Sequence, residues 1–341
     1  MIKKILLLLI AVSVFSCGKK ENQNTQTNTS SNTGNAPIKV GLVFDVGGRG
    51  DKSFNDAAYA GLEKAQKELG IEFEDIDPGN GSDRESALRK FAARPDIALI
   101  FGVGFIFTDD INNVAKEFPN KKFACIDYSI TDPNTIPPNV LAVEFKEEEG
   151  SFLVGAIAGL KTSTNKIGFI GGVESPLIKK FETGYVQGAK YSNPNIEVFT
   201  SYISVTPDGF KNPGKAQEIA LSQYTKGADI IYHASGLSGL GLFEAAKEQK
   251  KFAIGVDMDQ WNEAPGQVIT SMIKQVSEAI YGTIKLLKEG QFKGGIKVFG
   301  LSDNGIGYVY DDNNKSLLSK DIIDKVEAMK EKIKKGEITI K

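Results

Sequence analysis

Three short apolar runs in this sequence are each followed by an aspartate, and carboxylates placed in this way could hold a ligand. The aspartates are Asp45, Asp127 and Asp257, which follow the runs 38–44, 122–126 and 251–256. An ionised carboxylate only accepts hydrogen bonds, so it suits a ligand that carries hydroxyl or N–H groups. Each aspartate could instead be only the N-cap of the next helix. We expect that the three do not all serve merely as caps.

Two phenylalanines stand at corresponding places in the two halves of the chain, each in a turn that leads into an expected helix. Phe54 follows the loop 45–53, and Phe210 lies in the turn 207–213. Two aromatic side chains can hold a planar ring between them, and such a contact contributes about 0.5–1.5 kcal/mol beyond the burial of area. Either phenylalanine could instead be an ordinary core residue. If both face one cleft, they form a stacking site.

Signals for metal, phosphate or acid–base chemistry are weak. The glycine-rich segment 47–50 has neither the G-x-G-x-x-G pattern nor the G-K-[ST] ending of phosphate loops, and we interpret it as a floppy loop that closes over a ligand. His233 is the only histidine, which argues against a histidine base and against a multi-histidine metal site. We therefore predict no metal, no cofactor and no enzymatic activity.

The length and composition are those of a soluble chain with two domains. Of the 341 residues, 41% are hydrophobic and 25% are charged, which is typical of globular proteins. The formal net charge of −2 gives no support to a nucleic-acid partner. Cys125 lies in the apolar run 122–126 and is expected to be a small buried hydrophobic residue.

Strands alternate with helices from residue 38 onward, which is typical of a parallel α/β sheet. The first half has expected strands at 38–44, 71–76, 97–101 and 122–126, with helices around 57–69, 86–93 and 109–118. The second half repeats this order with strands at 166–172, 196–203, 228–232 and 251–256, and helices at 179–190, 214–224 and 239–247. Gly184 and Gly188 are expected to let their helix lie close to a sheet. A helix at 271–288 and a strand at 296–301 follow.

The repeat predicts two Rossmann-like lobes with parallel central sheets, joined by a multi-strand hinge. Ligands of open parallel sheets bind beyond the carboxyl ends of the strands, so two such edges would enclose a cleft that a hinge can close. We assign residues 38–143 and about 268–291 to an N-terminal lobe, and residues 144–267 and about 292–341 to a C-terminal lobe. Lys274 falls on the expected helix 271–288, where a lysine is ordinarily a solvated surface charge.

The N-terminus indicates export and attachment to a membrane. Residues 1–16 join a positively charged start to a short apolar run, as in a signal peptide. The sequence Val-Phe-Ser-Cys-Gly at 14–18 resembles a bacterial lipobox, so Cys17 is the expected lipidation site; a plain secretory signal with a chance cysteine is the alternative. Residues 17–37 lack a hydrophobic pattern and are expected to be a flexible tether. The folded body would then lie in the cell envelope, periplasmic or surface-exposed.

One long motif and several shorter segments carry a resemblance to a known family. The motif is Asp45-x-Gly-Gly-x-x-Asp-Lys-Ser-Phe-Asn55, and the shorter segments are Glu182-x-Gly-x-x-x-Gly188, 236–246, 255–260 and 271–274. Over residues 38–310 the chain resembles the basic membrane protein family of bacterial lipoproteins, and within it the purine-nucleoside receptors of ABC transporters. The resemblance implies a class I periplasmic-binding-protein-like fold of the Venus flytrap kind. It also implies guanosine, adenosine or inosine as the ligand and an ABC permease as the partner.

The resemblance implies two groups of ligand-binding residues. Phe54 and Phe210 would stack on the two faces of the purine, while Asn55 and Asp45 would bind its edge. The ribose hydroxyls would be bound by Asp127, Asp257 and Lys274, with the backbone near Gly236 assisting. A carboxylate is suited to this role because it can accept two hydrogen bonds from a vicinal diol.

Other functions stay open on the residues alone. A sugar or autoinducer receptor of the same architecture would use the aromatic pair to stack on a pyranose. A nucleoside hydrolase would need a clustered-carboxylate metal site or a histidine acid, whereas the carboxylates here are spread over two lobes. A surface adhesin is favoured by no particular feature.

Overall fold

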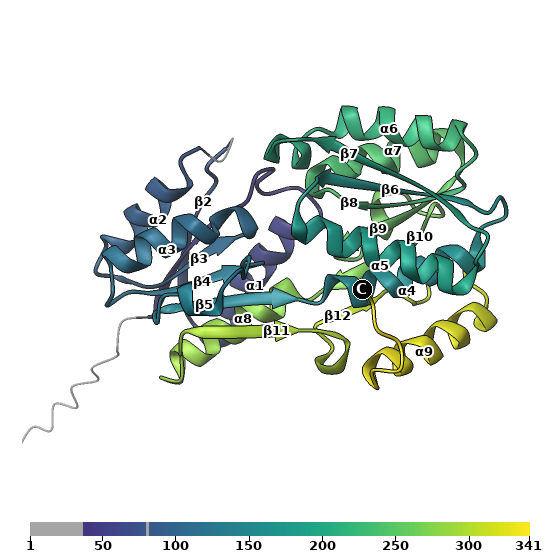
Figure 1. Ribbon diagram of the computed structural model, residues 1–341. Coiled ribbons are helices and arrows are strands. Elements are labelled where there is room, and N and C mark those ends of the chain that lie inside the picture. The colour runs from purple at the N-terminus through teal and green to yellow at the C-terminus, as the bar shows by residue number, and fades with distance from the viewer. Residues whose placement is uncertain (1–36, 80–81) are drawn as a thin grey trace, which may run out of the picture. The chain divides into compact units, whose positions relative to one another are not determined.

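A computed structural model describes residues 37–79 and 82–341 (Figure 1). The predicted signal peptide, Cys17 and the predicted tether up to residue 36 lie outside the described residues. Within the described residues, the strands form two six-stranded sheets. Two predominantly parallel sheets with helices between their strands are the architecture that the alternating pattern predicts.

The first sheet is entirely parallel and has the order β11-β5-β4-β3-β1-β2. Its strands are β1 (Lys39–Val43), β2 (Glu72–Ile76), β3 (Ile97–Val103), β4 (Lys122–Ile126), β5 (Val140–Phe145) and β11 (Gly295–Phe299). Its helices are α1 (Phe54–Leu69), α2 (Arg84–Ala92), α3 (Thr108–Glu117) and α8 (Val276–Lys288). Helices α1 and α8 pack on each other, and α2 packs on α3, so helices cover both faces of the sheet (Figure 1).

The second sheet has the order β12-β10-β9-β8-β6-β7, and only the edge strand β12 is antiparallel to its neighbour among the described strands. Its strands are β6 (Lys166–Val173), β7 (Glu197–Ser204), β8 (Ile230–Ala234), β9 (Phe252–Asp257), β10 (Val268–Lys274) and β12 (Ile306–Tyr308). The accompanying helices are α4 (Glu147–Lys161), α5 (Pro176–Ser192), α6 (Pro213–Thr225), α7 (Gly239–Gln249) and α9 (Lys320–Lys334).

Strand β1 shows how a continuous apolar run serves a sheet that is covered on both faces. Val40 and Leu42 belong to the buried cluster that contains the apolar face of α1, whereas Val43 belongs to the cluster under α2 and α3. Successive side chains of a strand point to opposite faces, so both faces of β1 are buried.

The region after residue 267 differs from the expected assignment. The expected helix 271–288 is wrong in its first part, because Val268–Lys274 forms the strand β10 and the helix begins at Val276. Strand β10 pairs with β9 in the second sheet, and β11 pairs with β5 in the first. The expected lobe assignment is therefore wrong for both strands. Strand β10 was assigned to the N-terminal lobe but belongs to the second sheet, and β11 was assigned to the C-terminal lobe but belongs to the first sheet. Backbone hydrogen bonding decides this exchange: β10 pairs with β9, the strand that precedes it, whereas β11 pairs with β5, which is distant in the sequence.

The chain passes between the two sheets three times within the described residues. The crossings lie between β5 and α4, between β10 and α8, and between β11 and β12. They correspond to the multi-strand connection that the sequence pattern predicts.

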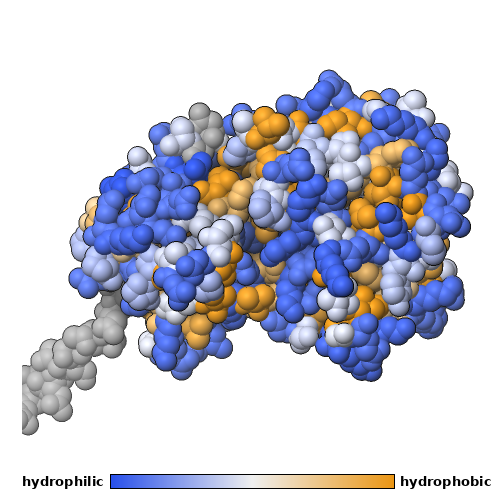
Figure 2. Space-filling view, in the orientation of Figure 1, coloured by the Kyte–Doolittle hydropathy of each residue, from blue (hydrophilic) through white to orange (hydrophobic). Residues whose placement is uncertain are grey.

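Hydrophilic side chains cover most of the face shown in Figure 2, and apolar side chains form separate patches. Among the described residues, no helix has the length and apolar character needed to cross a bilayer.

Gly184 and Gly188 in α5 have a different role from the one expected. A methyl group on Gly188 would lie 1.9 Å from the carbonyl oxygen of Phe152, and one on Gly184 would lie 2.3 Å from that of Glu148. Both carbonyls belong to α4. The small residues therefore let α5 lie close to another helix rather than to the sheet.

We expect Gly188→Ala to destabilise the protein by about 1–3 kcal/mol, because the added methyl group overpacks the contact between α4 and α5. Gly282→Ala in α8 is the matched control, since a methyl group there meets no atom of the described residues within 4 Å and alanine favours a helix by about 0.8–1.0 kcal/mol over glycine. Urea denaturation measures both free energies of unfolding. Equal stability of the two variants would contradict this packing.

Candidate ligand-binding site

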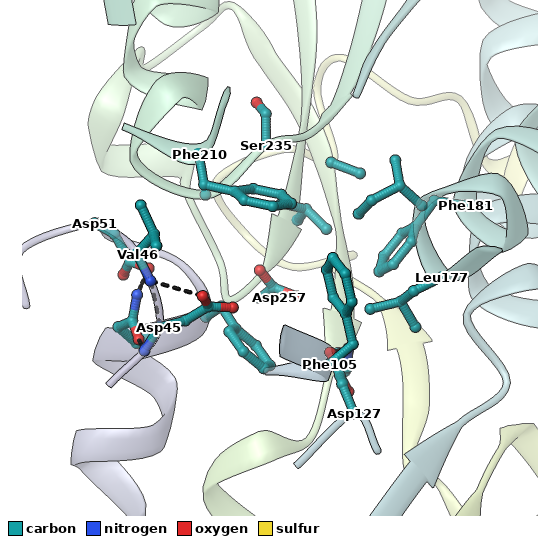
Figure 3. Close-up of a pocket in the computed structure, with 17 residues that line it drawn as sticks. Asp45, Val46, Asp51, Phe105, Asp127, Leu177, Phe181, Phe210, Ser235 and Asp257 are labelled. Atoms are coloured by element: carbon teal, nitrogen blue, oxygen red, sulfur yellow. Dashed lines mark hydrogen bonds and ion pairs between the residues drawn. The ribbon is translucent and has the colours of Figure 1, made fainter. Parts of the chain in front are cut away.

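A cavity lies where the carboxyl ends of strands from both sheets meet. It contains about 490 Å³ of non-protein space, a figure that includes open solvent. Asp45, Asp127 and Asp257 reach it from the ends of β1, β4 and β9, and Lys274 reaches it from β10. Figure 3 shows Asp45 and Asp51 on one side of the cavity, with Phe105, Leu177 and Phe181 on the opposite side.

The structure brings all eight ligand-binding candidates to this one cavity. They are Asp45, Phe54, Asn55, Asp127, Phe210, Gly236, Asp257 and Lys274. The two phenylalanines come from different halves, because Phe54 begins α1 whereas Phe210 ends the short helix η3 (Pro207–Phe210) beside β6. Neither is a plain core residue, since both line the cavity. Their role in binding stays a prediction.

Nine further lining residues were not predicted. They are Val46, Asp51, Phe105, Leu177, Ile178, Phe181, Ala234, Ser235 and Val256. Phe105 follows β3, so the rule that ligands bind beyond strand ends could have found it. Leu177, Ile178 and Phe181 sit in the first turns of α5, and their apolar types do not distinguish a cavity wall from a core.

Asp51 caps the first turn of α1, which leaves Asp45 available to the cavity. The Asp51 carboxylate accepts hydrogen bonds from the backbone N–H groups of Asn55 (2.9 Å) and Asp56 (3.1 Å), and from the side-chain amide of Asn55 (3.1 Å). The Asn55 side-chain oxygen in turn accepts from the backbone N–H of Asp45 at 2.9 Å. Within the glycine-rich segment 47–50, the N–H of Gly48 donates to the carbonyl of Asp45 at 3.0 Å and that of Gly50 donates to the Asp56 carboxylate at 2.8 Å; its expected mobility stays a prediction.

Asp127 and Asp257 share an unusual backbone conformation at the ends of their strands. Their φ angles are +62° and +67°, in the left-handed region that non-glycine residues rarely adopt. Such strained residues cluster at ligand sites. In the described part of the chain, the Asp127 side chain bonds Lys274 and that of Asp257 bonds the Ser53 hydroxyl, so neither caps a helix. The alternative that these aspartates are only N-caps is wrong for both.

Lys274 is buried in an ion cluster and is not the solvated surface charge that was expected. Its side chain is only 2% exposed, and its ammonium lies 2.5 Å from Asp127 and 3.1 Å from Glu147. The same ammonium lies 5.0 Å from the ring centre of Phe54 and 5.4 Å from that of Phe181, within cation–π range. Glu147, at the start of α4, was not predicted; an acid at a helix start usually complements the helix dipole.

Burial governs the ionisation of the acids in the cavity. It raises the pKa of Asp45 to about 7 and the pKa of Asp51 to about 6. Burial also raises the pKa of Asp127 to about 7, against the opposing effect of Lys274. For Lys274, burial alone would lower the pKa, but the carboxylates of Asp127, Glu147 and Asp257 outweigh it and raise the pKa. The ammonium therefore stays charged.

Two contacts join the loop after β1 to the second sheet. The Ser53 hydroxyl donates to Asp257 at 2.5 Å, and the side-chain amide of Gln260 donates to the carbonyl of Lys52 at 2.9 Å. The oxygen of the same Gln260 amide lies 3.0 Å from Nε2 of His233. These bonds hold the two sides of the cavity together.

His233 is buried and does not line the cavity. Burial lowers its pKa to about 4. The imidazole is therefore neutral at pH 7. Within residues 37–79 and 82–341, no group of three or more His, Cys, Asp or Glu residues is placed to hold a metal ion.

Comparisons with known proteins agree with this architecture. A family model described as "ABC transporter substrate-binding protein PnrA-like" matches residues 38–341. Basic membrane protein A of Borreliella burgdorferi is 35% identical over 99% of this chain and 95% of its own length. A CD4+ T-cell-stimulating antigen of Listeria innocua is also 35% identical, over 98% of this chain and 96% of its own. A lipoprotein of Pyrococcus abyssi is 35% identical over 82% of this chain and 71% of its own.

A solved structure supports the same assignment. An ABC transporter solute-binding protein from Aeropyrum pernix superimposes with a TM-score of 0.82 at 30% identity, covering 89% of this chain and 93% of the other. The predicted two-lobed periplasmic-binding-protein-like fold and the predicted family are therefore confirmed. The chain belongs to the basic membrane protein (Bmp) family of ABC transporter substrate-binding proteins, whose role is to bind a solute for an importer.

Proposed function

We propose that this protein captures a purine nucleoside in the cavity and delivers it to an ABC permease, while a lipid on Cys17 holds it on a bacterial membrane. The observation that carries the proposal is the joint presence of two aromatic rings and several buried carboxylates in one cavity. The rings of Phe54 and Phe210 suit a planar base. The carboxylates suit a partner with many hydrogen-bond donors.

Asp127 supports a hydroxyl-bearing ligand most directly. Its Oδ2 atom pairs with Lys274, whereas its Oδ1 atom is buried and has no hydrogen-bond partner among the described residues. A buried acceptor without a donor costs roughly 1–3 kcal/mol. A ribose hydroxyl would supply the missing donor, and Asp257, which also lines the cavity, would accept from the neighbouring hydroxyl.

We expect at least one of guanosine, inosine and adenosine to bind with a Kd of about 1 μM or tighter, because stacking and charged hydrogen bonds act together. Isothermal titration of protein that has been unfolded and refolded, to release any co-purified ligand, measures the affinity. Tighter binding of free ribose or galactose would favour a sugar receptor instead. Release of free base during incubation would indicate a hydrolase.

The same titration tests the site. Asp127→Ala and Phe54→Ala are each expected to weaken nucleoside binding at least about tenfold, or about 1.4 kcal/mol, while circular dichroism shows a folded protein. Asp127→Asn preserves the side-chain volume and separates loss of charge from loss of packing. Phe199→Ala is the matched control, since Phe199 is a partly buried residue of β7 that does not line the cavity. Unchanged affinity in the Asp127 and Phe54 variants would show that the ligand binds elsewhere.

Nucleoside affinity is expected to rise between pH 5.5 and pH 8. The raised pKa values of Asp45 and Asp127, about 7 in the empty cavity, leave these groups largely protonated at pH 5.5. Ligand donors prefer the ionised carboxylates, so binding should weaken about tenfold or more as the pH falls through 7. Purine nucleosides do not themselves titrate in this interval. Titrations across the range measure the effect, and a constant Kd would contradict the role of these acids.

The anchor is tested separately from the cavity. When the whole chain is expressed in a bacterial host, we expect it to partition with the detergent phase, because acylation at Cys17 adds apolar chains. Cys17→Ser should move the protein to the aqueous phase. Cys125→Ser is the matched control, because Cys125 is buried in β4 and has no part in the anchor. Equal partitioning of the two variants would refute lipidation at Cys17.

A further inference from the structure

The lining of the cavity contains three chemically different regions. Asp45, Asp51 and Asn55 form a polar region around the start of α1. Asp127, Asp257 and Lys274 form a second polar region at the ends of β4, β9 and β10. Phe105, Leu177, Ile178 and Phe181 form a third region, the apolar wall, and the other lining residues include the polar Ser235 and the backbone of Gly236.

We propose that this apolar wall is a subsite for an apolar group on the 5′ carbon of the bound nucleoside, such as the methyl of a 5′-deoxy nucleoside or a 5′-alkylthio group. The proposal rests on the proposed function, because it assumes a nucleoside in the cavity. It names a narrower class of ligand, in which the 5′-hydroxyl is absent or replaced.

The apolar wall offers a ligand no polar side chain. Ile178 and Phe181 are only 4% and 3% exposed. Figure 3 shows Phe105, Leu177 and Phe181 across the cavity from Asp45 and Asp51. Phe105 also packs edge-on against Phe210, with ring centres 6.4 Å apart, so the apolar wall is continuous with the aromatic group expected to stack on the base.

The three regions match the three ends of a nucleoside by elimination. A base edge has N–H groups and acceptors that suit Asp45 and Asn55, and a ribose diol suits Asp127 and Asp257. The 5′ carbon is then left to face the apolar wall. A 5′-hydroxyl placed there would lose its water without gaining a partner, which is unfavourable. An apolar group of similar size would instead gain from burial.

Neither the N-terminus of α5 nor the lysines near this wall provide a binding site for a 5′-phosphate. Ser175 caps α5 by accepting from the backbone N–H of Ile178 at 3.3 Å, and the helix begins at Pro176, which has no N–H to donate. Lys179 pairs with Glu174 and Glu182. The polar regions add acidic groups that would repel an anion.

Lys180 and Lys274 are also committed to existing partners. Lys180 lies 3.4 Å from Glu147, and Lys274 lies between Asp127 and Glu147. A phosphate would have to compete with carboxylates for either ammonium. The electrostatics of the cavity therefore favour an uncharged 5′ end.

The test compares one nucleoside with its own derivatives by isothermal titration of the wild-type protein. The parent is whichever of guanosine, inosine and adenosine binds most tightly, and the series is its 5′-deoxy, 5′-methylthio and 5′-phosphate forms. We expect the first two derivatives to bind as tightly as the parent or up to about tenfold more tightly. The 5′-phosphate is expected to bind about a hundredfold more weakly, or not at all.

The possible outcomes separate the two proposals. If the parent binds but both apolar derivatives lose about tenfold or more, the subsite is overturned and the nucleoside receptor stands. If the 5′-phosphate binds as tightly as the parent, the subsite is likewise overturned. If no nucleoside or derivative binds, the proposed function fails and the subsite fails with it.

Leu177→Asn provides a second measurement, because it places an amide in the apolar wall. The ratio of the Kd for the parent to the Kd for the 5′-methylthio derivative should fall by about fivefold or more, since the amide can bond the 5′-hydroxyl. Leu221→Asn in α6 is the matched control, a half-buried leucine outside the cavity, and should leave the ratio unchanged. An equal ratio in both variants would overturn the placement of the 5′ carbon.

Discussion

The ammonium of Lys274 is buried between two carboxylates, and the geometry of the cavity depends on that cluster. Asp127 belongs to the first sheet, Glu147 begins α4 directly after a crossing, and Lys274 ends β10 directly before another. Removing one partner of a buried pair typically costs about 3–5 kcal/mol, because the other charge is left without compensation. The cluster therefore ties together the strand ends that form the floor of the cavity. It also brings a positive charge against the rings of Phe54 and Phe181.

Parallel sheets explain why so many acids reach one place. Asp45, Asp127 and Asp257 follow strands whose carboxyl ends share an edge of a sheet, and the two edges face one cavity. The left-handed backbone at Asp127 and Asp257 turns the chain sharply where each strand stops. The acids remain compatible with burial because Lys274 and Ser53 satisfy some of their oxygens. The oxygens that remain could accept hydrogen bonds from a ligand rich in donors.

Much of the site could be predicted from the sequence, because strand ends and turn aromatics are local features. The residues that were missed have no local signal. Glu147 starts the helix α4, which is buried on most of its surface. The helix therefore has no amphipathic pattern from which a buried role for Glu147 could be predicted. The sequence does not distinguish Leu177 and Phe181 from core residues, and only the folded structure shows that they line the cavity. Lys274 was named through its resemblance motif and lines the cavity, but the surface exposure that is ordinary for a lysine was the wrong expectation.

The amino-acid order by itself determined the alternation of strands and helices, the repeat of that pattern and the aspartates at the strand ends. These features follow from periodicity and turn chemistry, which act over a few residues. Only the tertiary structure decided that β10 and β11 exchange sheets, because strand pairing joins segments more than a hundred residues apart in the case of β11 and β5. It alone also decided the burial of Lys274, since the charge of a side chain does not reveal which distant carboxylates surround it. Long-range pairing and desolvation depend on the whole fold, and no short window of sequence contains them.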